Sequence, residues 1–320
     1  MIKFILKRLL AAIPLLFFIT FITLLLMHCV PGDYFSQLKM NPLISRDVIA
    51  LYETKFHLND TVIMQYVSWL RGIAHGDFGY SFSFQRPVSA VIFSRLYNTL
   101  LLSLSAFSLS WCCAIPAGLF AAYRHNTVVD KAISTITYAL TSIPSFVLAL
   151  VVLFLCAQYT SLPLGGAQSI DHEYLSFAGR IGDRLEHLAV PVLILSLYSF
   201  GYLYRVVRLH ALDSLRSDHI VMLYARGLSH GVVVKHLLRN ILNPLVSLFG
   251  MELPSLLSGA ALIEIITNWP GLGSVMLYAV RSHDVYLIMG NMVMISVVLV
   301  AGILLSDIML AFVDPRIRHV

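Results

Sequence analysis

Charged side chains are scarce in this sequence. Only 12% of its 320 residues are Asp, Glu, Lys or Arg, whereas a soluble domain carries about 25%. Hydrophobic residues make up 58% of the chain. This balance excludes an ordinary soluble protein and predicts an integral membrane protein.

Cysteine is also scarce, and its spacing excludes two classes of site. The chain has four cysteines, all in apolar stretches and without a CxxC or Cys/His pattern: Cys29, Cys112, Cys113 and Cys156. Such cysteines indicate buried structural thiols and not metal ligands or a disulfide framework.

Motifs that would indicate catalysis are absent. The sequence contains no GxxxxGK[ST] phosphate loop, no zinc-protease HExxH and no GxSxG element of serine hydrolases. Its twelve histidines show no metal-ligand spacing. We therefore expect a non-catalytic protein that binds no metal and no nucleotide cofactor of its own.

Apolar segments of about 20 residues recur along the chain, which is the length needed to cross a bilayer. The first one, 22 uncharged residues from Leu9 to Val30, is too long for a signal peptide and lacks a cleavage site, so we interpret it as a retained span. We expect six spans in a single transmembrane domain covering residues 1–320. They are residues 9–30, 97–123, 132–159, 188–207, 245–267 and 285–310.

The segments between these spans have distinct characters. Residues 31–95 form the largest extramembrane piece, with a short surface helix in HLNDTVIMQYVSWLRG and a loop in GDFGYSFSFQRPV. The sequence TNWPGLG at 267–273 predicts a helix break, because a proline and two glycines lie within four residues.

Charge distribution predicts the orientation. With both termini in the cytoplasm, the inner segments carry 13 Lys and Arg against 5 Asp, and the outer segments carry 9 basic against 10 acidic residues. An excess of Lys and Arg is typical of cytoplasmic loops. The count places residues 31–95 in the periplasm and residues 208–244 in the cytoplasm.

The basic stretch from Arg205 to Pro244 predicts an ordered loop. We expect a short helix at 219–226, Gly227 in a left-handed C′ position, and Ser229 as the cap of a second helix that ends near Asn240. Leu228 could pack on Val233 as a hydrophobic staple.

Two interpretations of this loop stay open on the residues alone. It either contacts another protein or is a solvated loop that only fixes topology. Its apolar neighbours favour a protein groove or anionic lipid over nucleic acid.

Glu252 and Glu264 are the acidic residues well inside a predicted span. A carboxylate in hydrocarbon costs about 2.5 kcal/mol or more, so such residues usually face an interior or an aqueous path. On an ideal helix they lie about 120° and about 18 Å apart, so they do not form one paired site. Each either hydrogen-bonds a neighbouring helix or lines a pathway.

Over its whole length the chain resembles the first permease subunit of bacterial peptide-class ABC importers, the oligopeptide, dipeptide and nickel branch. Ten segments in order carry this resemblance. They are FILKRLLAAIPLLFFITFITLLLMHCVPGD, GDFGYSF, IPAGLFAA, SIPSFVLAL, LPLGG, HLAVPVLILSL, ARGLS, HLLRNILNP, ALIEIITNWPGLG and DPRI.

The resemblance implies a type I ABC importer permease fold with six transmembrane helices, in the bacterial inner membrane. It implies a coupling loop, the EAA loop, that docks on an ATP-hydrolysing subunit. The implied coupling residues are Ala225, Arg226, Gly227, Leu228, Ser229, His236, Asn240 and Pro244. The implied translocation path includes Glu264, Trp269, Pro270 and Gly271.

The chain departs from the family pattern within this loop. Val221 stands where the broader importer pattern has an acidic residue six positions before the glycine. Leu223 and Tyr224 stand where peptide-branch relatives more often carry small and basic residues.

The implied partners are a second homologous permease subunit, two ATP-binding subunits that bind the ATP, a periplasmic or lipoprotein substrate-binding protein, and membrane lipid. No nucleic acid is implied. An ion-coupled secondary transporter and a non-transporting membrane assembly protein are the alternatives. The sequence does not choose among oligopeptide, dipeptide, nickel, antimicrobial peptide and sugar as substrate.

Overall fold

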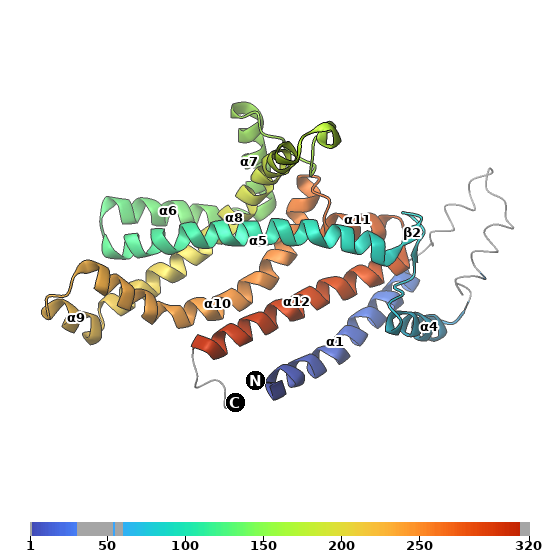
Figure 1. Ribbon diagram of the computed structural model, residues 1–320, viewed down its shortest axis with the longest axis horizontal. Helices are drawn as coiled ribbons and strands as arrows, with labels where there is room; N and C mark the ends of the chain where they lie inside the picture. Colours follow the sequence, from blue (N-terminus) through green and yellow to red (C-terminus); the bar gives the residue numbers. More distant parts are fainter. Residues whose placement is uncertain (1, 31–53, 55–59, 314–320) are drawn as a thin grey trace. The chain divides into compact units, whose positions relative to one another are not determined.

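The computed structural model describes residues 2–30, 54 and 60–313, and its elements are almost all helices (Figure 1). The chain divides into two compact units. Unit 1 is made mainly of Thr99–Pro270 and Ala301–Val320, and unit 2 of Ile2–Asn98 and Gly271–Val300.

The longer helices are α1 (Ile2–Cys29), α5 (Val88–Tyr123), α8 (Phe177–Leu215), α10 (His230–Ile266) and α12 (Val285–Val313). The shorter elements are α4 (Val62–Ala74), α6 (Val128–Ser142), α7 (Ser145–Tyr159), η1 (His172–Tyr174), α9 (Asp218–Ala225) and α11 (Leu272–Arg281), with strands β1 (Tyr80–Ser81) and β2 (Arg86–Pro87).

Four helices in the described part of the chain are long and apolar enough to cross a membrane, namely α1, α5, α8 and α12. A fifth is reached if α6 and α7 count as one broken span. The predicted span 245–267 lies within α10, whose side chains are described only in part.

The predicted third span is not a straight helix. α6 and α7 meet at an angle of 111°. Pro144, the residue that precedes α7, causes the break. Proline disfavours the helical conformation in the residue on its N-terminal side. Ile143, at that position, is extended, with ψ 130°. The apolar run 132–159 therefore forms two helices that point in different directions.

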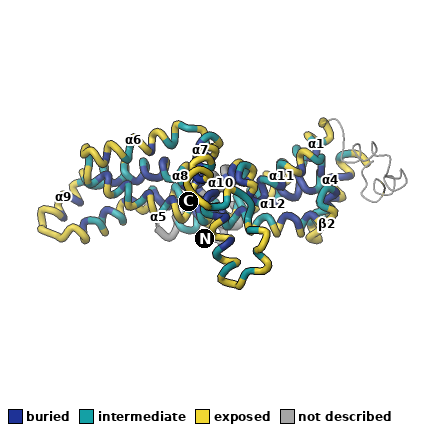
Figure 2. Tube along the Cα trace, turned by 90° about the horizontal axis from the view of Figure 1, so that it is seen from above, coloured by how far each residue is buried: buried dark blue, intermediate teal, exposed yellow. Residues whose placement is uncertain are grey.

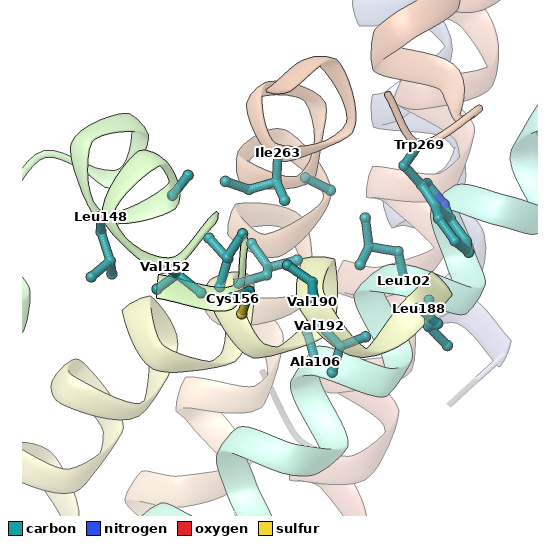
Figure 3. Close-up of a cluster of buried hydrophobic side chains, with 14 residues drawn as sticks. Leu102, Ala106, Leu148, Val152, Cys156, Leu188, Val190, Val192, Ile263 and Trp269 are labelled. Carbon is teal, nitrogen blue, oxygen red and sulfur yellow. The ribbon is translucent and has the colours of Figure 1, made fainter. Parts of the chain in front are cut away.

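In unit 1, helices α6, α7 and α10 pack against α8 (Figure 1). One hydrophobic core lies where α5, α7, α8 and α10 converge, and Figure 3 shows its side chains. Small residues allow the helices to approach: a Cβ on Gly118 would lie 2.8 Å from Val207, and one on Gly201 would lie 2.8 Å from Thr141. This is the close packing typical of membrane helices.

An ion pair joins the start of α6 to α8. Arg208 donates from Nε to Asp130 Oδ1 at 2.6 Å and from its Nη2 nitrogen to Oδ2 at 2.7 Å. The Asp130 carboxylate also accepts from the backbone N–H of Asn126 at 3.0 Å, just before α6. This bidentate hydrogen-bonded ion pair fixes the orientation of α6 on α8.

A second buried carboxylate organises the segment between α7 and α8. Asp183 accepts from the backbone N–H of Ser169 at 3.0 Å and lies 2.6 Å from His172 Nδ1. His187, one turn further along α8, hydrogen-bonds through Nδ1 to the Asp183 carbonyl at 2.8 Å. Residues 169–172 are thereby held against α8.

Unit 2 has a small core of its own, in which α4 packs on α1. Tyr66 of α4 hydrogen-bonds the Phe17 carbonyl at 2.7 Å. β1 and β2 form an antiparallel hairpin with Ser81 opposite Arg86, where we expected only a loop. The helix expected in HLNDTVIMQYVSWLRG is confirmed as α4.

Asp284 stabilises this hairpin. Its buried carboxylate accepts from the Ser81 hydroxyl at 2.7 Å and from the Ser83 hydroxyl at 2.6 Å. It also accepts from the backbone N–H of Leu287 at 3.3 Å, in the first turn of α12. One carboxylate thus joins the hairpin to the start of α12.

The cysteine prediction was wrong for three residues. Cys156 is buried, but Cys29, Cys112 and Cys113 are exposed on the surface of the chain. Their apolar sequence context does not imply burial in protein, because an apolar segment of a membrane chain can face lipid. All four are free thiols.

Asp130→Asn should lower the midpoint of thermal unfolding in detergent by several degrees. Asn cannot balance the charge of the half-buried Arg208, and loss of a hydrogen bond between charged groups costs about 1.5 to 3 kcal/mol. Lys131→Gln, at the exposed neighbouring position, is the control. Equal midpoints for the two variants would show that the ion pair does not stabilise the fold.

Candidate functional site: the α9 coupling segment

α9 is a short helix between two long ones, and its ends are well defined. α8 ends at Leu215 and α9 begins at Asp218, whose negative charge suits a helix N-terminus. At its other end, the N–H of Leu228 bonds the Leu223 carbonyl at 3.3 Å, and that of Gly227 bonds the Tyr224 carbonyl at 2.9 Å. These two bonds define a Schellman motif.

The prediction for Gly227 is confirmed. Its φ is +69°, the left-handed conformation that glycine adopts without strain. The predicted helix 219–226 is likewise confirmed as α9, shifted by one residue. The turn therefore reverses the chain between α9 and α10 in a fixed geometry.

The prediction that the next helix ends near Asn240 was wrong. α10 starts at His230 and continues through Asn240 and Pro244 to Ile266. Ser229 occupies the N-cap position but makes no side-chain cap hydrogen bond. Proline inside a membrane helix is tolerated, so Pro244 does not end α10. The predicted coupling residues His236, Asn240 and Pro244 and the predicted fifth span therefore lie on one helix.

The inner face of α9 is anchored by buried side chains. Ile220 and Leu223 pack with Val233 of α10, and all three are buried. Val233 thus packs against α9, whereas the expected staple partner Leu228 is exposed. α10 is tied to the end of α8 by the Asn240 side chain, which donates to Ser214 Oγ at 3.0 Å.

The outer face of α9 carries exposed apolar side chains. Figure 2 marks the exposed residues of α9 in yellow. Val221 is 54% exposed, Met222 43% and Tyr224 43%. The predicted coupling residues around the turn are also exposed: Ala225, Arg226, Gly227, Leu228 and Ser229. Clustered exposed apolar side chains mark interaction surfaces.

The remaining predicted coupling residues lie on α10. His236 is half-buried, with its ring centroid 5.6 Å from that of His219 on α9. Asn240 and Pro244 follow one and two turns later. Asn240 is exposed and Pro244 is half-buried.

The predicted path residues lie in packed protein. Glu264 is fully buried and accepts from Thr99 Oγ1 of α5 at 2.6 Å. Trp269 is buried in the core shown in Figure 3, and its backbone N–H bonds the Glu264 carbonyl at 2.8 Å. Pro270 is half-buried, and Gly271 is the N-cap of α11. The break predicted in TNWPGLG is confirmed by the end of α10 and the start of α11.

The partners of Glu252 were not expected from the sequence. Trp111 Nε1 donates to Glu252 Oε2 at 2.7 Å, and the Ser199 hydroxyl donates to Oε1. A tryptophan in an apolar span signals such a contact, because a buried indole N–H usually finds an acceptor. The sequence does not reveal which acceptor that is.

Two family models match almost the entire chain. Residues 1–104 match the N-terminal part of the binding-protein-dependent transport system membrane component. Residues 114–319 match the binding-protein-dependent transport system inner membrane component. The chain belongs to this family.

Similar proteins over the full length carry related names. The chain is 35% identical to the oligopeptide transport system permease protein AppB of Bacillus subtilis, with 100% of both chains covered. It is 30% identical to the metal-staphylopine import system permease protein CntB of Staphylococcus aureus, covering 100% of this chain and 99% of the relative. It is 29% identical to the dipeptide transport system permease protein DppB of Escherichia coli, again covering 100% and 99%.

A solved structure supports the fold. The MetNI methionine ABC transporter in an inward-facing conformation matches with a TM-score of 0.57 at 16% identity, over 71% of this chain and 97% of the other. The chain is thus an all-α type I permease and a multi-pass inner membrane protein. It is a non-catalytic permease subunit of an ABC importer and works with ATPase and other permease subunits.

Ile220→Ala should loosen α9 without unfolding the chain. Removing a fully buried Ile side chain costs about 2 to 5 kcal/mol, and here the loss falls on a local cluster. Hydrogen exchange of residues 218–228 should become at least tenfold faster. Val221→Ala, at the exposed neighbouring position, should leave the exchange unchanged; equal exchange in both variants would contradict the anchoring role.

Proposed function

We propose that this permease subunit forms half of a translocation pathway for peptides or related small solutes, paired with a second homologous permease subunit. The names of three full-length relatives support this class of solute: they describe oligopeptide, dipeptide and metal-staphylopine transport. The observation that carries the proposal is the exposed apolar face of α9 on an anchored helix.

In this proposal α9 is the coupling helix and docks in a groove on an ATP-binding subunit. Each apolar side chain fully buried on docking contributes about 1.5 to 3 kcal/mol. Val221, Met222 and Tyr224 supply such side chains. Val221 occupies the position that is acidic in the broader pattern, so an apolar contact replaces a charged one there.

The proposed assembly has two ATP-binding subunits, which bind all the ATP, and a periplasmic or lipoprotein substrate-binding protein that delivers the solute. ATP binding would bring the two ATPases together and move both coupling helices. The permease itself would use no cofactor.

The proposed topology has six spans with both termini in the cytoplasm. The excess of Lys and Arg in the inner segments supports this orientation. It places α9 on the cytoplasmic side, where ATP is available, and residues 31–95 on the side of the binding protein.

Gly227→Leu should abolish coupling while leaving the chain folded. A Cβ at Gly227 would meet nothing within 4 Å inside the chain, so the cost there is the positive φ alone, about 1 to 2 kcal/mol. The leucine side chain would instead clash with the ATPase groove. We expect loss of solute uptake and of ATPase stimulation by the loaded binding protein in reconstituted vesicles.

Gly76→Leu is the matched control for this variant. Gly76 also has a positive φ, +82°, and open space around its Cβ position, but it follows α4 and is remote in sequence from α9. It imposes the same backbone strain and should preserve transport. Normal transport by Gly227→Leu would disprove the docking assignment.

Glu264→Gln should slow uptake of several unrelated peptides if Glu264 shapes the pathway. Gln can still accept the Thr99 hydrogen bond, so the packing should persist and only the charge is lost. The exposed Glu186→Gln is the control. Wild-type rates for Glu264→Gln would assign this residue a purely structural role.

A further inference from the structure

Glu252 lies on α10 among side chains from three helices. Its carboxylate receives the Trp111 indole N–H from α5 and the Ser199 hydroxyl from α8. The residue is only 8% exposed. It is therefore a carboxylate enclosed by protein in the region predicted as the fifth span.

The two donors to this carboxylate do not balance its charge. Both of its donors are neutral, and in the described part of the structure no ion pair involves Glu252. The flanking residues 245–263 carry no other charged side chain. A buried carboxylate is normally paired with a cation or protonated, because burial of an isolated charge is expensive. If the residue only linked helices by hydrogen bonds, a neutral Gln or Ser would do so at a lower desolvation cost.

The Trp111 indole that donates to Glu252 belongs to a cluster of three aromatic rings. Phe107 stacks on Trp111 with ring centroids 4.9 Å apart. Phe249 meets Phe107 edge to face at 4.9 Å and Trp111 at 5.8 Å. It lies three residues before Glu252, on the same face of α10. All three rings are half-buried, so part of the surface of each ring is exposed.

A carboxylate beside aromatic rings is a combination that recognises ammonium groups. The carboxylate supplies the counter-charge, and the negative faces of the aromatic rings attract a cation in addition. The Trp111 and Ser199 hydrogen bonds fix the carboxylate but use only part of its acceptor capacity, since two carboxylate oxygens accept about four bonds. Among the described residues only these two donors contact the carboxylate, which leaves acceptor positions for an N–H donor.

We infer that Glu252, Phe107, Trp111 and Phe249 form a binding site for the protonated amine of the transported solute, such as the α-ammonium of a peptide. The identity of the solute in this inference rests on the proposed function. It concerns a site distinct from Glu264, which lies twelve residues, or about 18 Å, further along α10. The site would favour solutes with a free amine over their acylated forms.

Direct binding tests the site without transport. The complex, in lipid nanodiscs, is titrated with butylammonium or with neutral N-butylacetamide while tryptophan fluorescence is followed. The Trp111→Phe variant identifies the part of the signal that comes from Trp111. We expect the wild type to bind butylammonium and not the amide, and Glu252→Gln to weaken binding at least tenfold.

Two further variants separate recognition from folding. Glu252→Asp retains the charge and should restore part of the ammonium affinity that Glu252→Gln loses. Glu186→Gln, which removes an exposed carboxylate, should bind as the wild type does. Thermal unfolding is measured for each variant. The inference would be overturned if Glu252→Gln bound butylammonium as tightly as the wild type does. It would also be overturned if both Glu252→Gln and Glu252→Asp lost affinity only in proportion to a lower midpoint of thermal unfolding.

Uptake by reconstituted vesicles separates this inference from the proposed function. If the wild type imports a free-amine tripeptide and Glu252→Gln imports it at least tenfold more slowly, both are supported. If both import it equally, the amine site is wrong although peptide transport stands. If the wild type binds butylammonium but imports no peptide, the proposed solute class is wrong although the amine site stands.

Discussion

A carboxylate that leaves water must find hydrogen-bond donors inside the protein, and in a chain this apolar few donors are available. Several buried carboxylates among the described residues consequently join separate elements. Asp130 ties α6 to α8, Glu264 ties α10 to α5, and Glu252 ties α10 to both α5 and α8. In unit 2, Asp284 joins the hairpin to α12. Hydrophobic contact brings the helices together, but these polar contacts are directional and select how they face one another.

Contacts with buried side chains also hold the short helix α9 in place. α9 is held by Ile220 and Leu223 on one face and presents Val221 and Met222 on the other. A motion imposed on its outer face would therefore move α9 as a body. Because α10 continues unbroken from His230, about 55 Å at 1.5 Å per residue, that motion would pass along one helix to both buried glutamates. In the proposed function, this uninterrupted helix would link docking at α9 to the side chains further along α10.

Local sequence chemistry predicted the coupling turn well. Gly227 is the residue that a left-handed position requires, and TNWPGLG cannot continue a helix, so these features could be placed without knowledge of any neighbour. The prediction that the second helix ends near Asn240 was wrong, because α10 continues through Asn240 and Pro244. A proline predicts a helix end in water, whereas within an apolar bundle the surrounding helices compensate for the lost hydrogen bond. Pro144 did break its helix, and the sequence around it does not reveal the 111° turn that results.

By itself the sequence determined that this is an apolar, membrane-embedded permease chain with a basic segment near residues 205–244, since composition and ordered motifs depend on residue identity alone. Tertiary structure alone decided which donors Glu252 and Glu264 meet, that Val233 packs on α9, and that three cysteines are exposed. These facts depend on contacts between residues up to 165 positions apart, such as Thr99 and Glu264. No local pattern encodes such contacts, because they arise only when packed helices bring distant side chains together.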